Sequence, residues 1–200
     1  MDAMDGLEVR GCERCPELCD SRSRIVDGVG PADADVLFVG EAPGANEDEQ
    51  GEPFVGRSGD VLTEALRTVG LDRETVRITN CVRCRPPDNR DPRAGELANC
   101  RPYLEREVTL VDPEVVVTLG KVPAEHLLGR SVAVTKETGT VEEVRLGDDE
   151  PRRVLVCLHP AATLYDRSQR DPFEATLAEA AALAGRDGGE ESGQSRLGDF

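Results

Sequence analysis

Two Gly- and Pro-containing segments near the N-terminal third of the chain could surround a flat ligand. Residues 40–44 read GEAPG, and Phe54 follows within the sequence PFVG. Glycine and proline permit tight turns and a close approach of the backbone, whose exposed N–H groups could hold a carbonyl oxygen. A Phe ring in such a loop can stack on a planar molecule, although it could equally cap the core. Glu41 and Glu47 share this region, where acidic side chains are commonly just solvated.

Asn80 and His159 each follow a short apolar run. An Asn side chain carries both a donor and an acceptor, so Asn80 could read the edge of a base that offers the complementary pair; the simpler alternative is an Asn that forms a turn. His159 is one of two histidines, and Pro160 fixes the turn after it. The other histidine, His126, is predicted to lie on a helix surface. Asn80 and His159 are therefore candidate recognition residues.

Six of the seven cysteines are clustered in the sequence and include C-x-x-C pairs. An odd number, in a chain without a recognisable export signal, argues against a disulfide framework and favours a metal site. Local spacing alone would pair Cys12-x-x-Cys15 with Cys81-x-x-Cys84 as a zinc ribbon. The full set lies at positions 12, 15, 19, 81, 84, 100 and 157.

The elements that must position these residues alternate between strands and helices. Near-continuous Val, Leu and Ile runs are typical of strands buried on both faces. Strands are predicted at residues 35–40, 76–80, 114–120 and 153–159, with helices at 59–69, about 95–110, 122–128 and about 172–184. Residues 131–150 are predicted to form a β-hairpin insertion.

This alternation predicts an α/β fold, a three-layer α/β/α domain around a four-stranded, mainly parallel central sheet. In such sheets the ligand site lies outside the carboxyl ends of the strands, so the polar segments after the predicted strands should converge on one mouth. Residues 1–185 should form a single domain. The polar, Gly- and Ser-rich residues 186–200 are expected to be a disordered tail.

The charge of the chain does not exclude a nucleic-acid partner. The 200 residues carry 40 Asp and Glu against 24 Lys and Arg, a net charge of −16, and two of the basic residues are Lys. Abundant carboxylate with so little Lys favours adaptation to concentrated salt, where the Debye length is about 3 Å and net charge no longer steers partners. Residues 83–106 still hold six Arg against four acidic residues. No run approaches a membrane span, so we expect a cytoplasmic protein without membrane association.

Taken together, the motifs resemble one known family. GEAPGANEDEQGEPFVGRSG, ITNCVRCRPPDNRDP, VVVTLG and LHPAA, in this order and spacing, are similar to the family 4 uracil-DNA glycosylases, the iron–sulfur members of the uracil-DNA glycosylase superfamily. The match runs from about Cys12 to the helix after His159, and its first two motifs are highly specific. Combined with the acidic composition, the resemblance indicates a halophilic archaeon as the source.

The resemblance implies hydrolytic excision of uracil from DNA, which leaves an abasic site. The uracil would stack on Phe54, pair with Asn80 and accept a hydrogen bond on O2 from His159, while backbone amides of Gly40, Glu41 and Ala42 complete the pocket. Ala42 stands where other branches carry a carboxylate or Asn that positions water. Candidates for this role, left open by the sequence, are Glu41, Glu47 and Asn89. Candidate phosphate contacts are Arg57, Arg85 and Arg90.

The family pattern also implies a four-iron four-sulfur cluster held by Cys12, Cys15, Cys84 and Cys100. If Asn80 points into the pocket, the alternation of a strand directs Cys81 to the opposite face, toward the core. The cluster would clamp the N-terminus to the loop at residues 84–100, beside the DNA. Neither Cys19 nor Cys81 is expected to be a ligand, and Cys157 is predicted to be a buried strand residue.

The enzyme implied in this way is monofunctional, because no lysine is placed to form a Schiff base; Lys121 follows a predicted strand end but matches no nucleophile. Uracil-containing DNA is the expected partner of a monomer, and the residues do not specify a protein partner such as a sliding clamp. Two alternatives are a non-catalytic iron–sulfur nucleic-acid-binding module and a superfamily glycosylase that acts on other deaminated bases. The combination of Phe54, Asn80 and His159 favours uracil excision over both.

Overall fold

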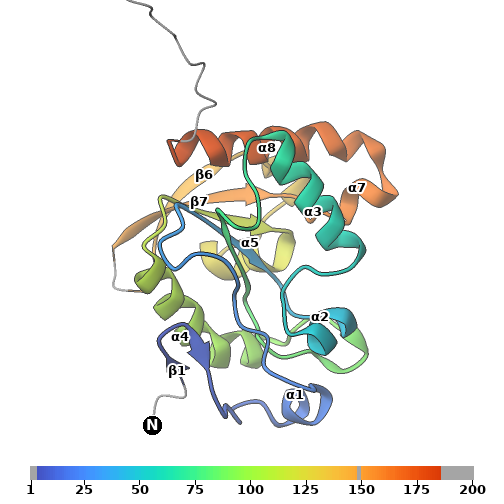
Figure 1. Ribbon diagram of the computed structural model, residues 1–200, viewed down its shortest axis with the longest axis vertical. Helices are drawn as coiled ribbons and strands as arrows, with labels where there is room; N and C mark the ends of the chain where they lie inside the picture. Colours follow the sequence, from blue (N-terminus) through green and yellow to red (C-terminus); the bar gives the residue numbers. More distant parts are fainter. Residues whose placement is uncertain (1–3, 148–149, 186–200) are drawn as a thin grey trace, which may run out of the picture.

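A computed structural model describes residues 4–147 and 150–185, and its centre is a five-stranded sheet in the order β4-β3-β5-β7-β6 (Figure 1). Strands β3 (Val36–Gly40), β4 (Arg77–Asn80), β5 (Val115–Leu119) and β7 (Pro151–Cys157) are parallel neighbours. Every residue of β3 and β5 is buried, as expected of strands covered on both faces. The α/β class and the mainly parallel sheet predicted from the sequence are confirmed.

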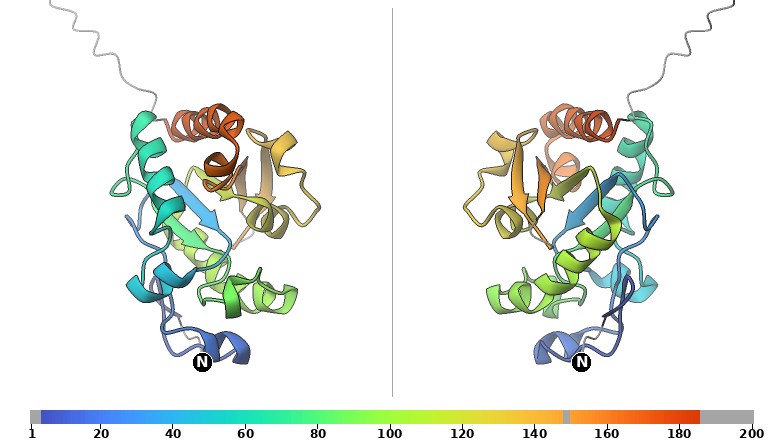
Figure 2. Two further views of the ribbon diagram at one scale, coloured as in Figure 1. Left: turned by 90° about the vertical axis from the view of Figure 1, so that its right-hand side faces the viewer. Right: turned by 90° about the vertical axis from the view of Figure 1, so that its left-hand side faces the viewer.

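Two layers of helices cover the sheet (Figure 2). Alternate residues of each strand enter different cores: Val36 and Phe38 pack with residues of α3 (Arg57–Thr68) and α8 (Arg170–Leu183). Leu37 and Val39 pack with residues of α4 (Ala94–Val111) and α5 (Lys121–Leu128). This two-residue alternation gives the three-layer arrangement expected from the sequence.

The hairpin predicted at residues 131–150 is wrong in its first half. Val134–Glu137 forms the short helix α6, in which Glu137 also accepts a hydrogen bond from the backbone N–H of Ala133. The strand β6 (Val141–Arg145) pairs instead with β7, antiparallel, and becomes the fifth strand of the sheet. Its alternating exposed and half-buried residues identify an edge strand, a pattern unlike the continuous apolar runs that revealed the other four. Residues 148–149 and the predicted disordered tail at 186–200 lie outside the described residues.

The N-terminal segment lies beside the start of α4 (Figure 1). It contains a small antiparallel ladder, β1 (Met4–Asp5) with β2 (Glu8–Val9), and the helix α1 (Pro16–Ser21).

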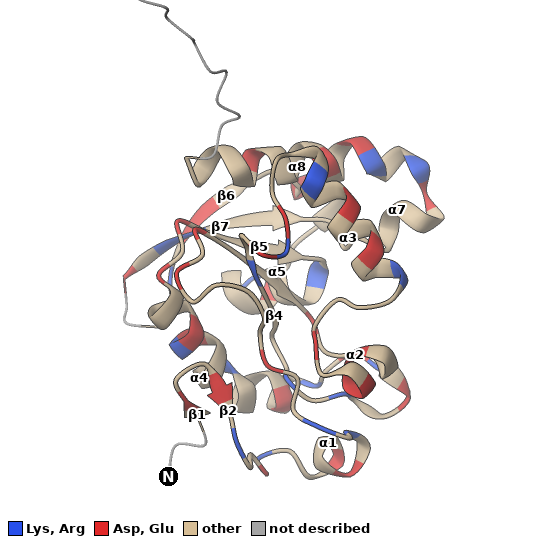
Figure 3. Cartoon of the chain, in the orientation of Figure 1, with Lys and Arg blue, Asp and Glu red and all other residues tan. Residues whose placement is uncertain are grey.

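Figure 3 shows acidic residues spread over most elements and basic residues along the loops beside α1. In the described part of the chain, no helix has the length and apolarity that crossing a membrane requires. The remaining short helices are α2 (Ala45–Gln50), η1 (Pro87–Asn89), α7 (Ala162–Tyr165) and η2 (Arg167–Gln169).

Candidate active site

A pocket of about 220 Å³ opens beyond the carboxyl ends of β3, β4 and β7. The parallel register places Gly40, the last residue of β3, beside Asn80, the last residue of β4. The loops that follow these strands therefore meet at one edge of the sheet, the position expected of a ligand site in an open α/β fold. The pocket is lined by Glu41, Ala42, Gly44, Glu47, Phe54, Ser58, Asn80 and His159.

Phe54 is both a core residue and a wall of the pocket. Its side chain is 7% exposed, and its ring centroid lies 5.8 Å from that of His159 at an interplanar angle of 35°. Its backbone has a positive φ of 54°, and Arg73 fixes the loop by donating to the carbonyls of Pro53 and Phe54 at 2.7 and 3.1 Å. The two interpretations offered by the sequence, a core cap and a stacking face, are thus compatible.

Gly40 is required by the close packing of Phe54 and Asn80. A Cβ atom at position 40 would lie 2.4 Å from Asn80 Oδ1 and 2.5 Å from the Phe54 ring, well inside normal contact distance. Any side chain there would push the two residues apart. Asn80 itself is 3% exposed, so its amide group has little access to bulk water. Because Asn80 lines the pocket and buried polar groups need hydrogen-bond partners, this amide can pair with polar atoms of a bound ligand.

His159 presents one ring nitrogen to the pocket. Its Nδ1 accepts a hydrogen bond of 3.2 Å from the backbone N–H of Ala161. Burial lowers the pKa of His159 from its usual value, which favours the neutral ring. With Nδ1 used as an acceptor, the single proton of the neutral ring lies on Nε2, which can then donate to a ligand.

The three candidates for positioning water occupy different surroundings. Glu41 and Glu47 both line the pocket, and Glu47 Oε2 accepts a hydrogen bond of 3.1 Å from the N–H of Gly44. Burial, reinforced by the carboxyl group of Asp91, raises the pKa of Glu41 to about 7. Asn89 lies in an adjoining groove and accepts a hydrogen bond from Arg85 at 2.8 Å.

That adjoining groove contains residues that the sequence did not single out. Leu164 and Tyr165 line it together with Arg57, and their side chains are 39% and 86% exposed. Ser58 lines both this groove and the pocket. Neither spacing nor composition could identify these residues, although Tyr165, one of two tyrosines, follows His159 by only six positions.

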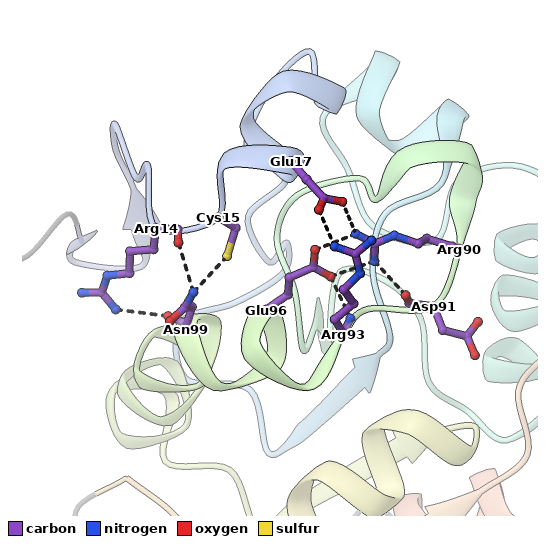
Figure 4. A network of polar contacts seen from close by, with 8 residues as sticks. All are labelled: Arg14, Cys15, Glu17, Arg90, Asp91, Arg93, Glu96 and Asn99. Carbon is purple, nitrogen blue, oxygen red and sulfur yellow. Dashed lines mark hydrogen bonds and ion pairs between the residues drawn. The ribbon is translucent and has the colours of Figure 1, made fainter.

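The predicted phosphate contacts differ in how free their side chains are. Arg57 is exposed in the groove, whereas Arg90 donates to both oxygens of Glu96, at 2.7 and 2.8 Å, and to Glu17 of α1 (Figure 4). Arg93 forms a further ion pair with Glu17. Arg90 therefore takes part in a bridge between α1 and the start of α4.

Four cysteines surround a second, small cavity. Cys12 and Cys15 come from the N-terminal segment, Cys84 from the loop after β4, and Cys100 from α4. Two N–H groups point at their sulfurs: Arg22 Nη1 lies 2.8 Å from Cys84 Sγ, and Asn99 Nδ2 lies 3.4 Å from Cys15 Sγ. Hydrogen bonds of this kind are typical of sulfur atoms that carry negative charge.

The other three cysteines do not line this cavity. Cys81 is fully buried and packs with Leu37 and Val39 in the core under α4 and α5, on the side that strand alternation predicted. Cys157 is fully buried in β7, and Cys19 directs its thiol to the carbonyl of Cys12. The described residues contain no group of three or more His, Cys, Asp or Glu side chains arranged around a single metal ion. The zinc ribbon suggested by local spacing alone needs Cys81 beside Cys84, and the structure places Cys81 in the core under α4 and α5 and not in the lining of the cavity that contains Cys84.

A pocket of Phe, Asn and His at the carboxyl edge of an α/β sheet can stack and hydrogen-bond a flat base, and comparisons with known proteins identify the family. The model of the uracil DNA glycosylase superfamily matches residues 28–181. The type-4 uracil-DNA glycosylase of Archaeoglobus fulgidus is 38% identical over 93% of this chain and 96% of its own length. The type-4 enzymes of Sulfurisphaera tokodaii and Thermotoga maritima are 39% and 40% identical, over 87% and 80% of this chain and 81% of their own lengths. The chain belongs to the type-4 uracil-DNA glycosylases of this superfamily.

Proposed function

We propose that this protein hydrolyses the N-glycosidic bond of deoxyuridine in DNA, releasing uracil and leaving an abasic site. The observation that carries the proposal is the convergence of Phe54, Asn80 and His159 on one pocket at the carboxyl edge of the sheet. The relatives named type-4 uracil-DNA glycosylase support it. A base inside a duplex cannot reach such a pocket, so the deoxyuridine must rotate out of the stack.

The pocket can distinguish uracil from cytosine through one amide group. A flipped uracil stacked on Phe54 would present N3–H and O4 to Asn80, whose Oδ1 accepts and whose Nδ2 donates. Cytosine offers an acceptor at N3 and a donor at N4, the reverse order. With Asn80 buried, the wrong base would leave polar groups unpaired, at a cost of about 1–3 kcal/mol each.

Bond cleavage would involve His159, which stabilises the leaving uracil, and one polar side chain that positions the attacking water. As the glycosidic bond breaks, negative charge develops on uracil O2, and His159 Nε2–H would donate to it without needing to reorient, because the Ala161 N–H holds the ring. Glu41, Glu47 and Asn89 are the candidates for positioning the attacking water. Lys121 is exposed and paired with Glu125 at the start of α5, which supports hydrolysis rather than Schiff-base chemistry.

DNA would run over the groove that adjoins the pocket. Arg57 and Asn89 offer donors for phosphate oxygens, and Arg85 lies beside Asn89. The acidic composition suits a halophilic source, in which screening removes the long-range repulsion between this surface and DNA. Binding would then depend on close arginine contacts, stacking and shape.

The four cysteines around the second cavity fit a four-iron four-sulfur cluster held by Cys12, Cys15, Cys84 and Cys100. A single ion gathers its thiolates within about 2.3 Å of one point, whereas such a cluster holds four thiolates around a larger body. Donors already lie at the sulfurs of Cys15 and Cys84. When bound, the cluster supplies a structural cross-link between the N-terminal segment and α4. Residues 1–185 would then act as one domain of a cytoplasmic, monomeric protein.

Release of uracil from a labelled single-stranded oligonucleotide, measured in molar salt, tests the function. The visible absorption spectrum of the same sample tests the cluster. A coloured protein that binds the oligonucleotide and releases no base would favour the non-catalytic module. Release of hypoxanthine or xanthine at rates equal to that of uracil would favour the broader glycosylase.

A further inference from the structure

One buried carboxylate beside the pocket has no part in uracil recognition. Asp48 lies in the short helix α2, is 3% exposed and does not line the pocket. Its Oδ1 accepts hydrogen bonds from the backbone N–H groups of Ser23 at 2.9 Å and Arg24 at 3.4 Å, and its Oδ2 accepts from Ser23 at 2.9 Å. Burial of a carboxylate is costly unless such donors compensate it. Asp48 therefore ties α2 to a segment 25 positions earlier in the chain.

That segment is itself fixed to the wall of the cysteine cavity. Arg22 Nη1 donates to Cys84 Sγ at 2.8 Å, and Arg22 Nη2 donates to the carbonyl of Cys12 at 2.7 Å. Four residues further on, the N–H of Val26 donates to the carbonyl of Arg83 at 2.8 Å. The two N–H groups that bond to α2 lie between these anchors, so the cavity wall and the chain after β4 set their position.

The helix α2 also carries a carboxylate of the pocket. Glu47, the residue before Asp48, lines the pocket and accepts the N–H of Gly44 at 3.1 Å. Within the same turn, the N–H of Asp48 donates to the carbonyl of Gly44 at 3.0 Å, and the N–H of Gly51 donates to that of Glu47 at 2.7 Å. A helix of six residues is too short to be stable by helix formation alone. Its position depends on tertiary contacts, among them the bonds of Asp48.

The three candidates for positioning water differ in a way that favours Glu47. Its carboxylate lines the pocket and is held by a backbone N–H. Asn89 lines the adjoining groove and not the pocket, and its Oδ1 is engaged by Arg85. Burial raises the pKa of Glu41 to about 7, so that much of this carboxyl group is protonated near neutral pH and is a poorer acceptor for a water proton.

We propose that Asp48 is a positioning residue for base excision: it sets the place of α2, and with it the Glu47 carboxylate, relative to the segment anchored at the cysteine cavity. This inference rests on the proposed uracil excision, with Glu47 as the group that orients the attacking water. Misplacement of a reacting group by about 1 Å can cost about 100-fold in rate, so the anchoring of α2 bears directly on the chemical step. Residues 22–24 and α2 then connect the cysteine cavity with the pocket.

Single-turnover excision by the holoprotein, with enzyme in saturating excess over DNA, tests the proposal. Asp48→Ala removes both acceptor oxygens, so excision should slow by roughly ten- to 100-fold, while iron content and DNA affinity stay nearly unchanged. Asp48→Asn keeps one oxygen, which can accept both N–H groups as Oδ1 does, and should restore the rate to within about threefold. Glu49→Ala is the matched control, because it removes an exposed carboxylate of the same helix and should leave the rate unchanged.

A double-mutant cycle separates positioning from a general loss of stability. If Asp48 acts through Glu47, adding Asp48→Ala to Glu47→Ala should slow excision by less than about twofold, against about tenfold or more in the unchanged protein. A residue that only stabilises the fold would slow both proteins by the same factor. Should Asp48→Ala fail to fold, Asp48→Ser takes its place in the cycle with the same expected result, since its hydroxyl is one bond shorter than the carboxylate.

Amide hydrogen exchange of the free protein gives a readout independent of turnover. In Asp48→Ala the amides of residues 22–24 and of α2 should exchange faster, while those of β3 and β5 keep their protection. Glu49→Ala should change neither group.

An Asp48→Ala protein that excises uracil at the unchanged rate, or one that slows the Glu47→Ala protein about tenfold as well, would overturn the positioning role. An unchanged protein that releases no uracil would instead overturn the proposed function. Hydrogen exchange then still decides whether Asp48 fixes α2 to residues 22–24.

Discussion

The candidate active-site pocket and the cysteine cavity are held in place by different kinds of contact. Asn80 and Gly40 stand at the ends of paired strands, where the backbone register of the sheet fixes their separation. The cysteine cavity takes two of its four sulfurs from residues 4–21, whose two strands, β1 and β2, pair with each other and not with the large sheet. Individual side chains hold that segment, including Arg22 on Cys84, Asn99 on Cys15 and Arg93 on Glu17.

This difference predicts that the two regions fail separately. Backbone hydrogen bonds in a buried parallel sheet do not depend on any one side chain, so pocket variants should lose chemistry while keeping the fold. The cavity depends on single side chains and on the proposed cluster, so its variants should release the N-terminal segment first.

The largest expected effect is on the cluster. Cys84→Ser should remove nearly all of the visible absorbance and iron, and should expose the N-terminal segment to limited proteolysis. Cys81→Ser, in the core of the sheet, should keep its iron. Iron analysis of these two proteins and of Cys100→Ser decides the matter: loss of iron in Cys81→Ser with retention of iron in Cys100→Ser would show that the ligand set is wrong.

The next effect is on the chemical step. His159→Ala removes a preoriented donor to the developing charge on uracil, so single-turnover excision should slow by roughly 10²–10³. DNA affinity, measured by anisotropy in molar salt, should be nearly unchanged, because phosphate contacts supply most of the binding. An equal loss in rate and affinity would make His159 a binding group, and no change in either would end its catalytic assignment.

A smaller effect is expected on base discrimination. Asn80→Asp replaces the donor toward uracil O4 by a second acceptor, which costs about 1–3 kcal/mol and slows uracil excision by roughly ten- to 100-fold. Discrimination between uracil and cytosine should narrow at the same time. Competition between the two substrates in one reaction measures the ratio, and unaltered uracil excision would remove Asn80 from recognition.

The smallest effects are expected for Arg57 and Arg90, which the sequence analysis predicts to have the same role, a contact with DNA phosphate. Arg57→Gln should weaken DNA binding a few-fold and leave the melting temperature unchanged, since Arg57 is exposed in the groove. Arg90→Gln should lower the melting temperature and the retention of iron, because its guanidinium joins Glu96 to Glu17. If Arg90→Gln weakens DNA binding more than Arg57→Gln does, the bridge between α1 and α4 is not its main role.

The sequence by itself determined the positions of the four parallel strands in the chain and the polar residues at their ends, but not the order of the strands in the sheet. Continuous Val and Leu runs report burial on both faces, and the carboxyl ends of such strands must share an edge, so Asn80 and His159 could be placed together without coordinates. The sequence did not determine the partner of β6, because its alternating VEEVR pattern fits an edge strand of any hairpin. The predicted partner preceded β6, within residues 131–150, whereas the strand that pairs with β6 is β7, which follows it.

Only the tertiary structure decided which side chains are free and which are engaged. Arg57 and Arg90 look equivalent in the sequence, and the contact of Arg90 with Glu17 joins residues 73 positions apart. Local patterns report burial and periodicity within a few residues, whereas the ion pair between Arg90 and Glu17 depends on distance in space, which only the folded chain sets.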